Sequence, residues 1–161
     1  MQHCFPPVTR PDTRMLVLGS LPGAVSLARQ RYYAHPQNQF WRLIGAAIGR
    51  DVDALDYEAR LEALLDAGVG LWDTVAAATR KGSLDSDLRL HEASDLAALV
   101  PTLPDLNAIA FNGGTSARIG RRQLGDVAGL ALIDLPSSSP AYASMTFENK
   151  KEAWRALSAY L

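Results

Sequence analysis

Cysteine and histidine are scarce in this 161-residue sequence, which contains one Cys and three His. A single cysteine, Cys4, excludes a disulfide within the chain. So few thiol and imidazole groups cannot assemble an iron-sulfur cluster or a zinc site of the Cys/His type. We therefore expect no metal centre, and no motif in the sequence requires another cofactor.

Long hydrophobic runs and an excess of either charge are also missing. No segment approaches the roughly 20 apolar residues of a membrane-spanning helix, and residues 1–14 are polar, interrupted by proline and unlike a secretion signal. The formal net charge of −1 gives no general attraction to nucleic acid, although most basic residues are arginines that could form a local patch. We expect a soluble cytoplasmic protein of bacterial type without a membrane partner.

The length and composition fit one globular domain. The chain is 48% hydrophobic and 20% charged, and a chain of this size buries roughly 70% of its unfolded surface. It contains no internal repeat and no low-complexity tract. We expect a single domain over residues 1–161, with residues 1–14 as an N-terminal extension.

Apolar runs alternate along the chain with amphipathic stretches. The runs predict strands, and the stretches, which carry apolar residues at helical spacing, predict helices. Such alternation favours an α/β fold, a three-layer α/β/α sandwich around a central, mostly parallel four-stranded sheet. The predicted strands lie in 15–20, 69–73, 106–114 and 129–139, and the predicted helices in 38–49, 56–68, 91–104, 115–125 and 146–161.

Glycine and capping residues set the predicted ends of these helices. Gly49 and Gly68 stand where a left-handed cap ends a helix. Ser94 is the expected N-cap of the helix in 91–104, and Thr146 is that of the last helix.

Unusual polar or glycine-rich segments follow each of the four predicted strands. In an open parallel sheet, ligands bind beyond the carboxyl ends of the strands, where the loops converge. The sequence therefore predicts a single site at that edge. The segments are "GSLPG" (19–23), "WDT" (72–74), "NGGTS" (112–116) and "LPSSSPAYA" (135–143).

The segment "GSLPG" supplies backbone amides and permits a close approach, as a loop that cradles a phosphate or a base requires. By itself it is equally compatible with a tight turn. No Gly-Lys-Ser/Thr follows, which disfavours a Walker loop, and Pro22 interrupts the dinucleotide-binding pattern.

The segment "YYAHPQNQFW" (32–41) predicts a loop followed by a helix that starts near Asn38. Pro36 pushes the preceding residue toward extended backbone, and Asn38 is a good N-cap type, which could be its only role. Tyr33 and Phe40 could belong to the core, and for Trp41 we favour the core. His35, beside proline, is expected as a loop residue held by hydrogen bonds.

Polar side chains after the other strands have both functional and structural interpretations. Asn112 can offer a donor and an acceptor to a flat base, or simply form a turn before two glycines. The three serines of 137–139 suit contact with phosphate oxygens, although such loops are common. Asp73 is expected as a cap or loop anchor, and the basic stretch 118–123 as a solvated helix. No nucleophile elbow is present, so no Ser-His-Asp set is indicated.

In this order, "GSLPG", "HPQNQFW" and "LPSSSPA" resemble the uracil-DNA glycosylase superfamily, most closely its hypoxanthine-DNA (deoxyinosine) glycosylase branch, over residues 15–161. The resemblance implies a base pocket, with Asn112 reading the base edge and Phe40 as all or part of a stacking platform. It also implies a loop pressed into the DNA minor groove. The implied pocket residues are Gly19, Ser20, Leu21, Pro22, Gly23, Tyr33, His35, Phe40 and Asn112, and the implied DNA-binding residues are Ser137, Ser138, Ser139, Pro140, Ala141 and Tyr142.

The sequence departs from this superfamily at one position that matters for catalysis. Many members have Asp or Asn in the first motif to position the attacking water, and Leu21 stands there instead. The resemblance then implies Asn38 as the catalytic residue. If so, Asn38 and Asn112 must line one hollow beside the first turn.

The resemblance implies a monomeric, monofunctional DNA N-glycosylase that works on nucleoid DNA. It would flip a deaminated base, hypoxanthine and also uracil, out of DNA and hydrolyse its bond to the sugar, leaving an abasic site. Two alternatives remain within the fold: a uracil- or mismatch-specific DNA glycosylase, and a non-catalytic nucleic-acid-binding domain. A third, from another class, is a small-molecule nucleotide-binding protein that uses 19–23 as a phosphate loop.

Overall fold

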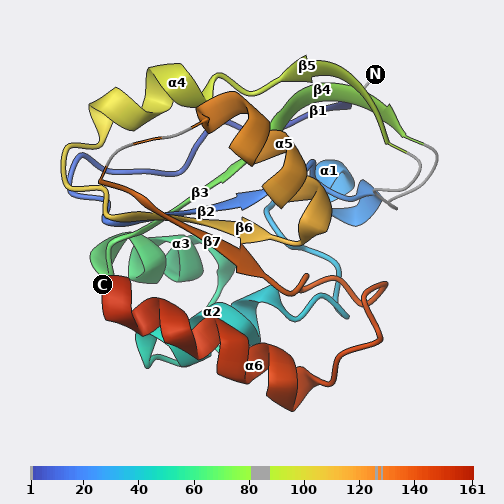
Figure 1. Cartoon of the computed structure of the whole chain (residues 1–161). Helices are drawn as coiled ribbons and strands as arrows, with labels where there is room; N and C mark the ends of the chain where they lie inside the picture. The colour runs from blue at the N-terminus through green and yellow to red at the C-terminus, as the bar shows by residue number, and fades with distance from the viewer. Residues whose placement is uncertain (1, 81–87, 126, 128) are drawn as a thin grey trace.

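A four-stranded parallel sheet forms the centre of the molecule. The computed structural model describes residues 2–80, 88–125, 127 and 129–161. The sheet has the strand order β3-β2-β6-β7, so the chain crosses over between neighbouring strands (Figure 1). All four predicted strands are confirmed, with the bounds β2 (Met15–Gly19), β3 (Val69–Asp73), β6 (Ala108–Asn112) and β7 (Ala131–Leu135).

The central strands are apolar because both faces of the sheet are covered. Every residue of β2 is buried, and its side chains alternate between two hydrophobic clusters. Met15 and Val17 belong to one cluster, and Leu16 and Leu18 to the other. This two-sided burial is typical of a parallel sheet between helix layers and confirms the predicted three-layer α/β/α fold.

One face of the sheet packs against α2 (Phe40–Ile48), α3 (Tyr57–Asp66) and α6 (Phe147–Arg155), which lie below it in Figure 1. A 3-10 helix, Ala156–Tyr160, continues α6. The predicted helix ends at Gly49 and Gly68 are confirmed, and both glycines have positive φ. Thr146 caps α6 as predicted, because its Oγ1 accepts a hydrogen bond from Asn149 N at 3.2 Å.

The other face is covered by α5 (Gly114–Leu124) and by α4 (Leu96–Leu99), which continues as a 3-10 turn, Val100–Thr102. Above the same face lies α1 (Ala24–Arg29) (Figure 1). Gly120 allows α5 to approach the sheet, because a Cβ at this position would lie 2.4 Å from Cε1 of Phe111.

A second, antiparallel sheet was not predicted. It has the order β1-β4-β5 and is built from β1 (Gln2–His3), β4 (Val75–Arg80) and β5 (Leu88–Ala93). The expected helix in 91–104 is therefore wrong at its start, since Ala93 still pairs with Val75 of β4. The N-cap of α4 is Asp95, which accepts from Ala98 N at 3.0 Å, and Ser94 is buried instead.

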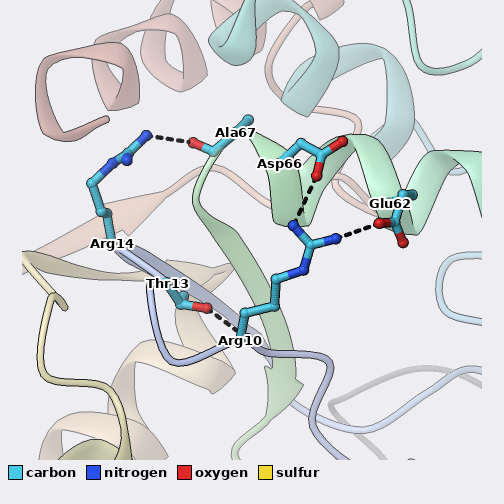
Figure 2. A network of polar contacts seen from close by, with 6 residues as sticks. All are labelled: Arg10, Thr13, Arg14, Glu62, Asp66 and Ala67. Carbon is cyan, nitrogen blue, oxygen red and sulfur yellow. Dashed lines mark hydrogen bonds and ion pairs between the residues drawn. The ribbon is translucent and has the colours of Figure 1, made fainter.

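The segment 1–14, expected as an extension, packs along β3 and α3 in its described part. Val8 forms an antiparallel bridge with Leu71 of β3, which covers that edge of the sheet. Arg10 pairs with Glu62 and with Asp66, the latter at 2.8 Å (Figure 2).

Arg14 strengthens the same attachment. Its Nη2 donates to the carbonyl oxygen of Ala67 at 3.0 Å, at the end of α3 (Figure 2).

Across the described residues, no helix combines the length and apolar character needed to span a membrane.

Candidate active site

A cavity of about 460 Å³ opens at the carboxyl ends of the four parallel strands. Segments that follow all four strands line it, as the sequence predicted for a single site. Of the residues predicted for the site, only Phe40 is missing from the wall. The lining residues are Gly19, Ser20, Leu21, Pro22, Gly23, Ala24, Val25, Ser26, Tyr32, Tyr33, His35, Asn38, Asp73, Asn112, Ser137, Ser138, Ser139, Pro140, Ala141 and Tyr142.

The backbone of the turn 19–23 lies close against Asp73 and Tyr33 because Gly19 has no side chain. A Cβ at Gly19 would lie 2.7 Å from Oδ1 of Asp73 and 3.1 Å from Oη of Tyr33. The turn is anchored to the segment after β3, since Thr74 N donates to Gly19 O at 2.8 Å. Leu21 is buried in a small apolar cluster, so its side chain offers no polar group to a water molecule.

Tyr33 forms the aromatic wall of the cavity, where the resemblance implied Phe40 as all or part of a stacking platform. Its ring stacks on Phe40 with a centroid separation of 3.8 Å and an interplanar angle of 11°, and Phe40 behind it is fully buried. Trp41 is in the core as favoured, and its Nε1 donates to Tyr33 O at 3.2 Å. Tyr33 has φ of 52°, a left-handed conformation that is rare outside glycine and is found at functional sites.

Asn38 lies at the cavity wall and caps the start of α2 as well. The helix begins at Phe40, two residues later than predicted, and Gln39 occupies the N-cap position. Asn38 still satisfies a helix donor, because its Oδ1 accepts from Phe40 N at 2.9 Å. His35 behaves as the predicted loop residue: it is exposed, and its Nδ1 accepts from Gln37 N at 3.1 Å.

Asn112 joins the end of β6 to the serine loop. Its Nδ2 donates to Ser138 Oγ at 2.9 Å and to Tyr33 Oη at 3.4 Å, and its Oδ1 accepts from Ser138 N at 2.9 Å. Ser138 is buried by these contacts. The amide predicted to read a base is thus also the anchor of the loop that was predicted to contact DNA.

The other serine hydroxyls stiffen the loop 137–142. Ser137 Oγ accepts from Ser139 N at 3.1 Å, and Ser139 Oγ accepts from Ala141 N at 3.2 Å. Tyr142 at its end is exposed. Hydroxyls that were expected only as phosphate contacts therefore first hold the loop in shape.

Asp73 lines the cavity, at the strand end where the segment "WDT" was predicted to contribute to the site, although its side chain was expected only as a cap or loop anchor. It ends β3 and is 3% exposed. Burial, and to a lesser extent the charge of Asp73, raise the pKa of the Tyr32 phenol, so Tyr32 stays protonated.

The described residues contain no group of three His, Cys, Asp or Glu side chains arranged to hold a metal ion. What the cavity offers is a flat aromatic wall, two carboxamides, the buried carboxylate of Asp73, backbone amides and hydroxyl groups. Asn38 and Asn112 line the same hollow beside the first turn, which is the geometry that the sequence-based hypothesis required.

The fold is an α/β/α sandwich with an aromatic wall and carboxamides at the carboxyl edge of its sheet. Such a site is suited to a flat group with polar edges, such as a nucleobase. The chain belongs to the uracil DNA glycosylase superfamily, whose family model matches residues 6–158. The assignment predicted from the three ordered motifs is therefore confirmed.

Relatives from two archaea carry the name hypoxanthine DNA glycosylase. One from Methanosarcina barkeri is 44% identical over 112 residues, which are 70% of this chain and 71% of that protein. One from Methanosarcina acetivorans is 38% identical over 153 residues, 95% of each protein. A solution NMR structure of a Methanosarcina acetivorans protein superposes with a TM-score of 0.84 at 36% identity, covering 97% of this chain and 98% of that one.

Proposed function

We propose that this protein is a monofunctional DNA N-glycosylase that flips hypoxanthine out of DNA and hydrolyses its bond to deoxyribose. The observation that carries the proposal is that Asn38 and Asn112 line one cavity beside the turn 19–23. The names of the two archaeal relatives support hypoxanthine as the base. Unstacking costs a few kcal/mol, and less for a mispaired base, so selectivity begins before the base enters the cavity.

Tyr33 is the surface on which the everted base stacks in this proposal. Its ring lines the cavity and is backed by Phe40, so it cannot retreat without disturbing the core. Asn112 keeps the second lone pair of Oδ1 for a base N–H, because Ser138 N uses the first. Backbone amides of the turn 19–23 are the candidate partners of the base oxygen.

Replacing Tyr33 tests this stacking. Tyr33→Ala is expected to lower the rate of base release about 10- to 100-fold, because base-aromatic stacking is worth about 1–3 kcal/mol. Tyr33→Phe keeps the ring and loses the hydroxyl that Asn112 contacts, so it should retain most of the activity. The measurement is single-turnover release from a deoxyinosine duplex, and equal losses in the two variants would contradict a stacking role.

Asn38 is the proposed water-positioning residue. Phe40 N–H fixes Oδ1, whose remaining lone pair can accept a hydrogen bond from a water molecule in the cavity. An amide cannot deprotonate this water strongly. It does not need to, because cleavage of an N-glycosidic bond through an oxocarbenium-like sugar leaves a strong electrophile, and positioning then supplies much of the rate.

The product of this chemistry is an abasic site without strand cleavage. Among the described residues that line the cavity there is no lysine to form a Schiff base with the sugar. This composition supports a hydrolytic, monofunctional enzyme.

Basic side chains beside the cavity support contact with the DNA backbone. A neighbouring hollow of about 400 Å³ shares Tyr33 and Asn38 with the first, and Arg29 and Arg31 line it. We infer that phosphates flanking the flipped nucleotide lie here, while the loop 137–142 contacts the strand on the other side of the cavity. We also infer that the protein acts as a monomer on DNA containing a deaminated base, in the cytoplasm where the nucleoid lies.

The direct test is incubation of the purified protein with duplexes that contain deoxyinosine or deoxyuridine, followed by alkaline cleavage at abasic sites. Strand scission is expected with deoxyinosine, and weaker or no scission with deoxyuridine. Scission with deoxyuridine alone would favour the uracil-specific alternative. Salt-sensitive binding without release of either base would favour a non-catalytic nucleic-acid-binding domain, and stabilisation by free nucleotides but not by duplex would favour a nucleotide-binding protein.

A further inference from the structure

Lys150 of α6 is a buried cation that lies behind the cavity walls. Only 2% of the residue is exposed. Its Nζ donates to Gln39 Oε1 at 3.1 Å and to the carbonyl oxygen of Ser139 at 3.4 Å. The same ammonium lies 5.3 Å from the ring centroid of Tyr142, a cation-π distance.

This charge is buried without a carboxylate beside it. In the described part of the chain, no Asp or Glu forms an ion pair with Lys150. Burial accordingly lowers the pKa of its ammonium group. Burying an unpaired charge in a protein interior is destabilising, whereas an apolar side chain of similar size would fill the same space without that penalty.

The acceptors of Lys150 belong to the two segments that carry the proposed chemistry. Gln39 directly follows Asn38, and its backbone N–H donates to Ser138 O at 3.0 Å. Ser139 lies in the loop 137–142, next to the residue that Asn112 anchors. The Gln39 side chain, Lys150 and Ser139 therefore make a second bridge beside the backbone bridge from Gln39 to Ser138.

We propose that Lys150 is a positioning residue for base excision, which acts through Gln39 and Ser139 to hold the Asn38 segment and the serine loop in one fixed relation. This proposal rests on the proposed glycosylase function. Its physical reason is geometric: the water-positioning amide and the DNA-gripping loop come from different ends of the chain, and Lys150 binds both. Because misplacement by about 1 Å can cost about 100-fold in rate, a small relative shift of the segments is sufficient to slow the reaction.

The experiment compares Lys150→Met with Lys151→Met. Methionine has a similar length and no charge, and Lys151 is the adjacent lysine on the same helix with no contact to either segment among those described. We expect Lys150→Met to lower the maximal single-turnover rate on a deoxyinosine duplex about 10- to 100-fold. The enzyme concentration for half-maximal rate should change less than about threefold, and the melting temperature should stay near that of the wild type.

Lys151→Met should match the wild type in all three measurements. A role confined to structure predicts instead that rate and melting temperature fall together in Lys150→Met. A double-mutant cycle with Gln39→Met adds a second criterion: the double variant should be no slower than the slower single variant, because both changes break one bridge. The proposal would be overturned if the rate losses of the two single variants multiplied in the double variant, or if Lys150→Met had the wild-type rate.

Hydrogen exchange at the Gln39 backbone amide tests the role of Lys150 without depending on base release, and therefore independently of the proposed function. This N–H bonds to Ser138 O, and its exchange should accelerate in Lys150→Met and not in Lys151→Met if Lys150 holds the segments together. A wild-type protein that releases no base would refute the glycosylase assignment and leave this exchange result intact. Unchanged exchange in an active wild-type background would refute only the role of Lys150.

Discussion

Asn38→Ala is expected to slow the release of hypoxanthine by about 100- to 1,000-fold, the loss typical when one preorganised polar group is removed from an active site. The cavity contains Leu21 where many superfamily members carry a water-positioning Asp or Asn, so no carboxylate or carboxamide in the turn 19–23 can substitute. The change also removes the acceptor of Phe40 N–H and should cost about 1 kcal/mol of folding free energy. Single-turnover release from a deoxyinosine duplex and thermal melting measure the two effects.

Asn38→Asp is the matched control for this prediction. Its carboxylate can accept from Phe40 N–H and from water as the amide does, so the variant should melt like the wild type and keep at least about a tenth of its rate. A loss of activity in Asn38→Ala that melting alone explains would argue for the simpler role, that of a helix cap. Full activity in Asn38→Ala would remove Asn38 from the mechanism.

The central sheet could be predicted from the sequence because its pattern is strong and local. Strands such as Met15–Gly19 are buried on both faces and are therefore continuous apolar runs that end in glycine-rich or polar segments. The rule that ligands bind beyond the carboxyl ends of parallel strands then brought four distant segments to one site, and the cavity lies there. Glycine and threonine caps set most helix ends for similar local reasons.

The second sheet and the aromatic wall could not be predicted because they depend on tertiary contacts. The segment that forms β5 runs directly into α4, so the apolar spacing of the helix masked the strand before it, and the third strand of this sheet, β1, comes from the distant N-terminus. The choice between Tyr33 and Phe40 depends on the left-handed backbone at Tyr33, which turns its ring over that of Phe40. No spacing in "YYAHPQNQFW" indicates which of the two rings covers the other.

Gly19→Val is expected to lower base release by more than about 100-fold, because the added side chain would displace Asp73 and Tyr33, two residues of the cavity wall. A Cβ at this position already lies 2.7 Å from Asp73 Oδ1 and 3.1 Å from Tyr33 Oη, closer than ordinary contacts allow. The two γ carbons of valine would extend further, so Asp73 or the stacking ring must move. A displacement of this size also costs about 1–3 kcal/mol of folding free energy, which lowers the melting temperature by several degrees.

Gly19→Ala and Gly114→Ala are the controls. They show whether a loss of activity comes from crowding at Gly19 or from replacing any glycine near the site. Gly114 begins α5, and a Cβ there meets no atom within 4 Å, so Gly114→Ala should keep wild-type activity and stability. Gly19→Ala adds only the first carbon and should fall between the wild type and Gly19→Val in rate. Binding of duplex DNA without an everted base should survive in both Gly19 variants, because the loop 137–142 and the arginines beside the cavity are untouched. If Gly19→Val releases hypoxanthine at the wild-type rate, the base does not enter this cavity, and the assignment of the site is wrong.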